Sequence, residues 1–526
     1  MLIIKSKRKR ALALDEPIKH GSHKRPVTRR DFLAQGFLTG SATVVAPAIL
    51  GALLNPRQAR ADLSQDLKDL KVNPCKITAG AGKVPFICFD LAGGANIAGS
   101  NVLMGKEGGQ LDFLSTQGYS KLGLPGDMLP NNATTDFINE EFGLMFHSDS
   151  AFLRGMLEKT STTTRAGVNG AIIAARSEND TGNNPHNPMY GLAKYGSKGE
   201  LLTLIGSENS DSGGNSMAPA MLMDVTNRPT KIDRTSDVTG LVDTGELGTL
   251  FTNPTDTVAV MESMARISQA KLGHVDTQLP TDTDVKNLVQ CAYIKTADTV
   301  DRFNNPAALN PSVDPLITGT GGVFGPDFGN DREFEKTAAV MKLVVDGLAG
   351  AGTISMGGFD YHTGDRATGE LRDLRAGRCI GACLEYAARK NKPVMIYVFS
   401  DGSLSSNGRV DSSVDGRNKG EWTGDNQQTA AAFFLVYNPP ASGGRPVLMT
   451  SGAGAPRHQQ IGYFSAGGDV VNSSSPAANN VNLLVQTVLL NYMALHGDAG
   501  QYNTAFGTAL GSGTALDGLI AFEPIV

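Results

Sequence analysis

The chain has few aromatic residues, a single tryptophan and only five cysteines among its 526 residues. Aromatic residues make up 6% of the chain, which leaves little material for the stacking surfaces that bind single-stranded nucleic acid. Five cysteines are too sparse for a disulfide scaffold, and they lack zinc-finger, haem and iron–sulfur spacing. We therefore expect them to be small buried hydrophobic residues. No three- or seven-residue period runs through the chain, which excludes collagen-like and coiled-coil structures.

Several motifs of common enzymes are also missing. The chain has no Walker A loop, and no Gly-x-Gly-x-x-Gly follows a predicted strand with an acidic partner. These patterns hold nucleotide phosphates, so we expect no nucleotide cofactor. The cysteine spacing noted above likewise leads us to expect no haem or iron–sulfur cofactor. Beyond residue 61 there is no Gly-x-Ser-x-Gly, the sequence that presents a nucleophilic serine in α/β-hydrolases.

Charge is divided unevenly along the chain. Residues 1–61 hold 12 of the 47 basic and 3 of the 52 acidic side chains, so the other 465 residues hold 35 and 49 and carry a net charge of −14. An acidic body argues against nucleic acid and against an anionic membrane surface as partners. Hydrophobic residues make up 40% of the chain, which is enough for a folded core and excludes a disordered chain.

Residues 1–61 have the order of a secretory signal, with a basic segment, an apolar stretch at 37–54 and small residues at 59 and 61. The run Arg29-Arg30-Asp31-Phe32-Leu33 resembles a twin-arginine signal. This resemblance implies that the twin-arginine export machinery is a partner and that the protein is periplasmic, with no stable membrane span after cleavage. The alternative is an uncleaved anchor, for which an apolar stretch broken by Gly and Pro is only marginal.

The rest of the chain alternates strand and helix patterns. Short apolar runs predict strands at 84–91, 171–175, 200–206, 351–356 and 394–399. Helical patterns lie at 149–160, 255–305, 331–348, 366–390 and 481–493. This alternation predicts a three-layer α/β fold, with a mostly parallel central sheet and helices on both faces. We expect a lead-in at 62–83 and a single large domain at 84–526, with loop insertions at about 207–250 and 402–430.

Acidic residues lie at or just beyond the ends of three of the predicted strands. Asp90 lies near the end of the first strand, Asp401 follows 394–399, and Asp360 and His362 come after 351–356 and two glycines. Ligands bind beyond the carboxyl ends of parallel strands. Asp360 and His362 are two residues apart, so an extended backbone points both side chains the same way. Carboxylates with an imidazole suit a divalent metal ion. The alternative is that these aspartates cap turns and helices.

A series of short blocks resembles, in order, the domain-of-unknown-function 1501 family. The blocks are Gly93-Gly94-Ala95-Asn96, Phe146-His147-Ser148-Asp149, Pro185-His186-Asn187-Pro188, Gly358-Phe359-Asp360-Tyr361-His362, Ser400-Asp401-Gly402-Ser403 with Asn407-Gly408, and Thr423-Gly424-Asp425-Asn426. They span most of residues 84–470. The family consists of exported bacterial proteins related in fold to alkaline phosphatases and sulfatases. The resemblance therefore implies an alkaline phosphatase-like fold and makes His186 a candidate catalytic residue.

Two positions depart from the family pattern. Asn96 stands where the family has an acid, and Asn426 where it has a histidine. Asparagine can bind Ca²⁺ or Mg²⁺ but is a poor ligand for Zn²⁺, so a two-zinc site is not expected. Asp425 could take the place of the lost histidine, and His458 could enter from a later loop. We therefore expect at most one divalent ion, Ca, Mg, Mn or Zn, held by residues from the set Asp360, His362, Asp401, Asp90 and Asp425.

Two functions remain open at this point. The first is a periplasmic metal-dependent hydrolase of phosphate or sulfate esters, whose partner is a small-molecule ester. The second is a non-catalytic protein that retains the fold to bind or assemble a partner in the cell envelope, which the two asparagines favour. No residue pattern identifies a nucleophile.

Overall fold

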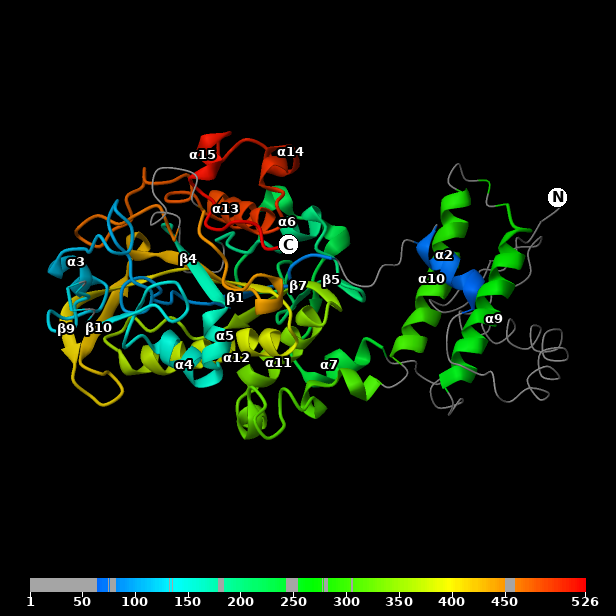
Figure 1. Cartoon of the computed structure of the whole chain (residues 1–526), viewed down its shortest axis with the longest axis horizontal. Coiled ribbons are helices and arrows are strands. Elements are labelled where there is room, and N and C mark those ends of the chain that lie inside the picture. Colours follow the sequence, from blue (N-terminus) through cyan, green and yellow to red (C-terminus); the bar gives the residue numbers. More distant parts are fainter. Residues whose placement is uncertain are drawn as a thin grey trace, which may run out of the picture. The chain divides into compact units, whose positions relative to one another are not determined.

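The computed structural model describes residues 64–73, 75, 82–131, 133–134, 136–177, 184–242, 254–276, 278, 282–303, 306–449 and 459–526. The signal predicted at 1–61 lies outside these residues, as does His458. The chain divides into two compact units, coloured along the sequence in Figure 1. One unit comprises Met1–Cys75 and Gly245–Arg302, and the other comprises Lys76–Thr244 and Phe303–Val526.

A sheet of eight strands forms the centre of the larger unit, in the order β12-β4-β11-β8-β1-β7-β5-β6. The strands are β1 (Phe86–Leu91), β4 (Val168–Ala174), β5 (Leu202–Gly206), β6 (Thr230–Lys231), β7 (Ala349–Met356), β8 (Val394–Ser400), β11 (Ala431–Tyr437) and β12 (Gln460–Ile461). Their pairings make every strand parallel to β1 except β11, which runs antiparallel between β8 and β4. The predicted mostly parallel α/β sheet is therefore confirmed.

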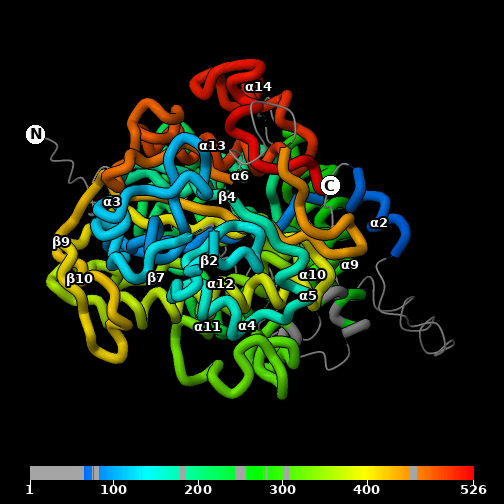
Figure 2. Tube along the Cα trace, turned by 60° about the vertical axis from the view of Figure 1, so that its left-hand side comes forward, coloured from blue at the N-terminus to red at the C-terminus, as the bar shows by residue number. Residues whose placement is uncertain are grey.

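Helices pack on both faces of this sheet (Figures 1 and 2). On one face lie α4 (Ala151–Lys159), α11 (Arg332–Val345) and α12 (Ala367–Arg389). On the other lie α6 (Met189–Tyr195) and α13 (Val481–Ala494). Two apolar layers result, one on each side of the strands.

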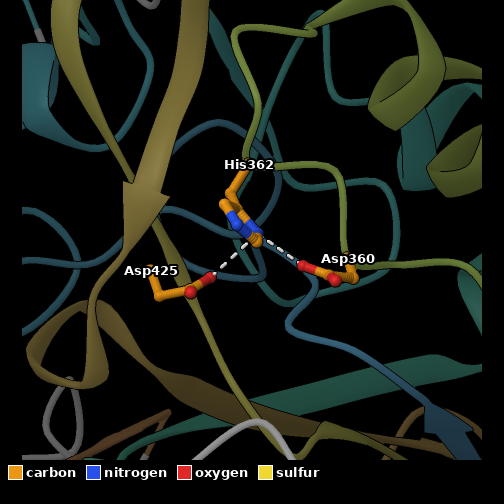
Figure 3. Close-up of side chains that lie close together, drawn as sticks. All are labelled: Asp360, His362 and Asp425. Atoms are coloured by element: carbon orange, nitrogen blue, oxygen red, sulfur yellow. Dashed lines mark ion pairs between the residues drawn. The ribbon is translucent and has the colours of Figure 1, made fainter.

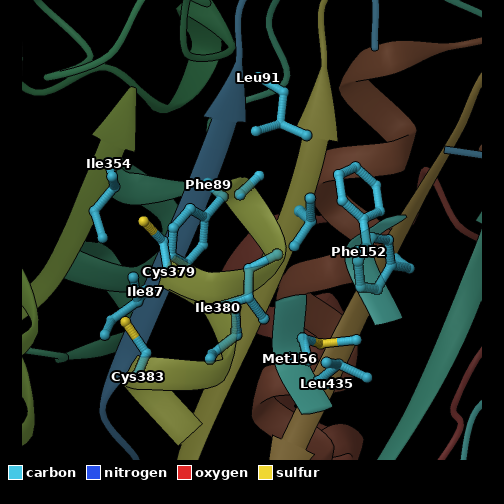
Figure 4. Packing of buried hydrophobic residues seen from close by; sticks show 14 of the residues in the cluster. Ile87, Phe89, Leu91, Phe152, Met156, Ile354, Cys379, Ile380, Cys383 and Leu435 are labelled. Atoms are coloured by element: carbon cyan, nitrogen blue, oxygen red, sulfur yellow. The ribbon is translucent and has the colours of Figure 1, made fainter. Parts of the chain in front are cut away.

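Strand β1 shows how the sequence produces these layers. All six of its residues are buried, and alternate side chains point to opposite faces of a strand. Ile87, Phe89 and Leu91 belong to the layer that includes Cys379 and Ile380 of α12 (Figure 4). Phe86 and Cys88 belong to the layer that includes α13. A strand covered on both faces is a continuous apolar run, so the sequence predicted this strand and its neighbours β7 and β8.

The two predicted loop insertions contain regular structure. The first includes β6 and α7 (Thr235–Gly240), and the second includes an antiparallel hairpin of β9 (Leu404–Asp411) and β10 (Lys419–Asp425). The remaining short elements are α3 (Thr116–Lys121), β2 (Ile138–Asn139), β3 (Phe146–His147), α5 (Thr162–Ala166), α14 (Tyr502–Phe506) and α15 (Thr514–Asp517). Eight described segments form 3₁₀ turns, at 220–222, 225–227, 306–309, 311–313, 325–330, 427–429, 440–442 and 499–501.

The smaller unit joins segments that are far apart in the sequence. It contains α2 (Gln65–Val72), α9 (Pro254–Leu272) and α10 (Asp282–Arg302). A disulfide links Cys75 to Cys291, and Lys71 forms an ion pair of 2.6 Å with Asp298. Residues 245–302 thus group with the segment before β1, whereas the sequence predicted that they belong to one domain spanning 84–526.

The expectation for the cysteines holds only in part. Cys88, Cys379 and Cys383 are free and buried, as predicted. The prediction is wrong for Cys75 and Cys291, because pairing across 216 residues depends on the fold and leaves no spacing pattern in the sequence. Among the described residues, no helix combines the length and the apolar character needed to cross a membrane.

Candidate metal centre

Three loops meet at the carboxyl edge of the sheet, after β1, β7 and β8. The Ala92 amide donates to the Met356 carbonyl (2.9 Å), and the Phe359 amide donates to the Ala92 carbonyl (3.1 Å). The Gly93 amide donates to Oδ1 of Asp401 (2.8 Å). These bonds tie the loop after β1 to the loop that carries Asp360 on one side and to Asp401 on the other.

Gly93 allows these loops to approach closely. Its φ of +121° is a backbone conformation that favours glycine. A Cβ atom at this position would lie 2.6 Å from the Asp360 amide nitrogen. The backbone of Asp360 is therefore held against a residue that must lack a side chain.

Asp360, His362 and Asp425 form a cluster at this edge (Figure 3). One ligand atom from each residue lies within 4.8 Å of the other two. His362 Nδ1 contacts a carboxylate oxygen of Asp360 and lies 3.1 Å from Oδ1 of Asp425. The side chains are 56% (Asp360), 30% (His362) and 47% (Asp425) exposed, so a ligand from solvent can reach them.

The donor set of this cluster fits a divalent cation. His362 Nδ1 is shielded from solvent and forms no hydrogen bond of acceptable geometry, although both carboxylates are close to it. Two carboxylates and one imidazole are ligands used by Mn²⁺ and Zn²⁺, and the carboxylates also suit Ca²⁺ and Mg²⁺. Three protein ligands would leave coordination positions for water or a substrate oxygen.

Asp425 reaches the cluster at the end of the β9–β10 hairpin. The register pairs Asp425 with Leu404, and the Asn426 amide donates to the Ser403 carbonyl (2.8 Å). The Asn426 side chain accepts from the Gln428 amide (3.0 Å) and caps the following 3₁₀ turn. Asp425 therefore lies next to His362, whereas the side chain of Asn426 caps the 3₁₀ turn that follows it.

A buried ion-pair network holds this hairpin at the end next to its turn. Glu370 of α12 is paired with Arg366 (2.6 Å), Lys419 (2.9 Å) and Arg154 (2.6 Å). Burial alone would raise the pKa of Glu370, but the positive charges of Arg366 and Lys419 outweigh it and lower that pKa. Lys419 begins β10 and Asp425 ends it, so this network holds the strand that carries Asp425.

Asp401 and Asp90 are not members of the three-residue cluster. Both are fully buried. Oδ2 of Asp401 accepts from Asn215 Nδ2 (3.1 Å), and Asp90 accepts from the amide (2.7 Å) and hydroxyl (3.1 Å) of Ser216. Burial, together with the neighbouring charge of Asp401, raises the pKa of Asp90 to about 7. These two aspartates hold loops together at the same edge of the sheet.

His186 lies in the apolar interior. It is 3% exposed, and its ring stacks on Phe399 with 5.7 Å between ring centres. Burial lowers the pKa of His186 to about 4. Its Nδ1 atom has no hydrogen-bond partner among the described residues. The structure does not bring this candidate catalytic residue into the cluster.

His147 is buried in a different way. Its Nε2 lies 2.9 Å from the Met128 carbonyl, and its Nδ1 accepts from the Asp149 amide (3.2 Å). Burial also lowers the pKa of His147 to about 4. Both ring nitrogens are engaged by backbone groups, so this histidine is structural.

Sequence reasoning missed the residues that hold the Asp360–His362 loop. Tyr361 lies between the two and is buried, and its hydroxyl donates to Oδ1 of Asp373 (2.9 Å). The other oxygen of Asp373 accepts from Asn101 Nδ2 (2.8 Å). Burial raises the pKa of Asp373 to about 7. The signal that could have found this anchor is an aromatic residue between two polar ones, since alternate residues of an extended segment face opposite ways.

Asn96 lies beside this anchor. Its backbone N–H donates to the Tyr361 hydroxyl (3.4 Å), and its side-chain Oδ1 accepts from the Ser100 hydroxyl (2.7 Å). Its Nδ2 is buried and has no partner among the described residues. Asn96 is therefore used within the protein and is not one of the three clustered residues.

No family model matches the chain, and neither a curated protein nor a solved structure matches it. The assignment of the centre therefore depends on its own geometry.

Proposed function

We propose that Asp360, His362 and Asp425 bind one divalent metal ion and that this centre hydrolyses phosphate or sulfate esters. The observation that carries the proposal is the juxtaposition of three ligand atoms within 4.8 Å at the carboxyl edge of a mostly parallel sheet. That edge is where such folds bind their ligands. Three protein ligands and exposed side chains leave room for a substrate.

A metal bound here would supply an electrophile for the ester oxygen and would make a coordinated water more acidic. Two anchored segments of the chain would hold this metal, a loop and a hairpin. Asp360 and His362 lie on the loop anchored through Tyr361, and Asp425 lies on the hairpin anchored through Lys419. The resemblance of the sequence blocks to the domain-of-unknown-function 1501 family supports the choice of phosphate and sulfate esters and an alkaline phosphatase-like arrangement of the sheet.

A second function, a non-catalytic envelope protein, is favoured by one specific observation. Asn96, which stands where the family pattern has an acid, is fully buried and hydrogen-bonded to Ser100. A fold that has replaced a ligand by a structural amide is consistent with a binding or assembly role.

We also propose that the protein is exported to the periplasm by the twin-arginine route. The sequence of residues 1–61 supports this, and so does the disulfide between Cys75 and Cys291. Disulfides persist in oxidising compartments and are rare in the cytosol. Amino-terminal sequencing of the protein recovered from periplasm tests the route, and a chain that begins near residue 62 is the expected result. Recovery of the uncleaved chain from the cytosol would contradict it.

Elemental analysis tests the metal centre. Protein purified without chelator should contain about one equivalent of a divalent metal, which Asp360→Asn and His362→Ala should lose. Asp415→Asn is the matched control, because Asp415 is an exposed carboxylate in the turn of the same hairpin. Equal metal content in all four proteins would overturn the assignment.

Turnover of 4-nitrophenyl phosphate and 4-nitrophenyl sulfate then separates the two functions. Hydrolysis by the wild type and by Asp415→Asn, but not by Asp360→Asn, supports the esterase. A metal-loaded wild type that turns over neither ester supports the non-catalytic function.

A further inference from the structure

Two Asn-Gly pairs occur in the chain, Asn169-Gly170 and Asn407-Gly408. In such a pair the backbone nitrogen of the glycine can attack the side-chain carbonyl carbon of the asparagine, because glycine has no Cβ atom to obstruct the approach. We propose that Asn407 is a modification site, which loses its amide and becomes aspartate or isoaspartate in the folded protein, whereas Asn169 stays intact. The proposal does not depend on the metal centre.

Asn407 lies in a bulge of β9. The register shift between Gly420 and Trp422 leaves residues 407–409 opposite a single residue of β10. All three are exposed, and Gly408 has a φ of +90°, a conformation that favours glycine. Residues in a bulge are left out of the ladder of hydrogen bonds. The backbone at this Asn-Gly pair is therefore not fixed by strand pairing, and water reaches it.

The hydrogen bonds around Asn407 favour the attack. Its Oδ1 accepts from the Arg409 amide (3.0 Å), and a donor at this oxygen stabilises the negative charge that develops there. The attacking Gly408 amide donates to the Ser406 hydroxyl (3.1 Å), so the proton that this nitrogen must lose already points at an oxygen atom. Among the described residues, none accepts a hydrogen bond from Nδ2 of Asn407, the atom that departs.

Ammonia is the leaving group of the reaction. The Gly408 nitrogen bonds to Cγ of Asn407 and gives up its proton, and the Cγ–Nδ2 bond breaks to release ammonia and leave a cyclic imide. Water then opens the ring at either carbonyl carbon, which gives aspartate or isoaspartate. Both products add a negative charge to the hairpin that carries Asp425. Isoaspartate also adds a carbon atom to the main chain of β9.

Asn169 has the same following residue in the opposite environment. It is 6% exposed and lies in β4, which pairs with β11 along its whole length. Its Nδ2 donates to the Pro446 carbonyl (2.9 Å), and its Oδ1 accepts from the Gly170 amide (2.9 Å) and from Gln459 Nε2 (3.1 Å). The strand must open before this pair can rearrange and meet water, so the fold protects Asn169.

Peptide mapping by mass spectrometry tests the site. The full chain is incubated at pH 8 in native buffer and, in parallel, in concentrated urea, and each Asn-Gly peptide is followed by the mass difference between an amide and a carboxylate. In native buffer Asn407 should convert at least about tenfold faster than Asn169, because only the pair in β4 must wait for the strand to open. In urea the two should convert at similar rates, since the fold no longer distinguishes them.

The variant Asn407→Gln is the matched control. It keeps an exposed amide but would have to close a larger ring, so it should stay intact in native buffer. An isoaspartyl methyltransferase should label the aged wild type and leave the aged variant unlabelled. Intact Asn407 in the native protein, or conversion of Asn169 at the same rate, would overturn the proposal. Equal labelling of the wild type and the variant would place the modification elsewhere and would overturn it as well.

Discussion

The same substitution should destabilise the protein far more at His147 than at His186, although both histidines are buried. Burial lowers both pKa values to about 4, against about 6.5 in an unfolded chain. His186 stacks on Phe399, and its Nδ1 has no partner within the described part of the chain. His147, by contrast, is bonded to two backbone groups. His186→Phe should therefore change the free energy of unfolding by less than about 1 kcal/mol at pH 8. His147→Phe should lose about 2–4 kcal/mol, because it leaves a buried carbonyl and a buried amide unpaired.

The pH dependence gives a second, independent magnitude. A histidine whose folded pKa is lowered contributes stability that is present above about pH 6.5 and is lost as the pH falls toward 4. The folded and unfolded pKa values are about 4 and 6.5, and at pH 4.5 about 1.9 units of this difference are expressed, because the folded histidine is still mostly neutral. At about 1.36 kcal/mol per unit, each histidine lowers the free energy of unfolding by about 2.5 kcal/mol at pH 4.5 relative to pH 8. Either Phe variant should therefore gain about 2.5 kcal/mol relative to the wild type between pH 8 and pH 4.5.

Urea denaturation of the wild type and both variants at pH 8 and pH 4.5 provides the assay. Comparison at each pH cancels the titration of every other group. If His186→Phe is destabilised at pH 8 as strongly as His147→Phe, then His186 has a partner and the interior assignment is refuted. A variant-to-wild-type difference that stays constant between the two pH values would refute the lowered pKa values.

Three further predictions follow from the supports of the site and from the disulfide. Tyr361→Phe keeps the buried ring but removes the hydroxyl bond to Asp373, so Mn²⁺ affinity should fall about tenfold in titrations, and unchanged affinity would contradict the anchoring role. Glu370→Gln leaves the buried charges of Arg366 and Lys419 without their carboxylate and should lower the free energy of unfolding of the larger unit by about 3–5 kcal/mol. Fluorescence of Trp422, the only tryptophan of the chain, measures this unfolding. Cys75→Ser opens a loop of 216 residues and should destabilise the smaller unit by about 5 kcal/mol, measured as faster limited proteolysis, with buried Cys383→Ala as the comparison.

The strands that carry the site could be predicted because they are local patterns. β1, β7 and β8 are apolar runs with an acid at or after the end: Asp90 lies within β1, next to its last residue, and Asp360 and Asp401 follow β7 and β8. Gly93 marks the tight loop after β1. Asp360 and His362 were found for the same reason, since they lie two residues apart after a strand. These features are encoded within a few residues of each other.

The sequence could not predict which aspartates join the cluster and which ones hold loops together. Asp401 is used by Gly93 and Asn215, and Asp90 by Ser216, and the positions of residues 215 and 216 depend on where a long insertion folds back. Asp425 reaches the cluster because β10 pairs with β9 and because Lys419, the first residue of β10, is bound to Glu370. Such contacts between distant segments leave no spacing in the sequence.

The disulfide has a consequence for how this chain breaks. A single cut by a protease anywhere between residues 76 and 290 would leave two fragments joined through Cys75 and Cys291. On a non-reducing gel the nicked protein would migrate near the intact chain, and it would separate into two bands only after reduction. Damage to the surface loops of that stretch therefore does not release the amino-terminal fragment from the rest of the molecule.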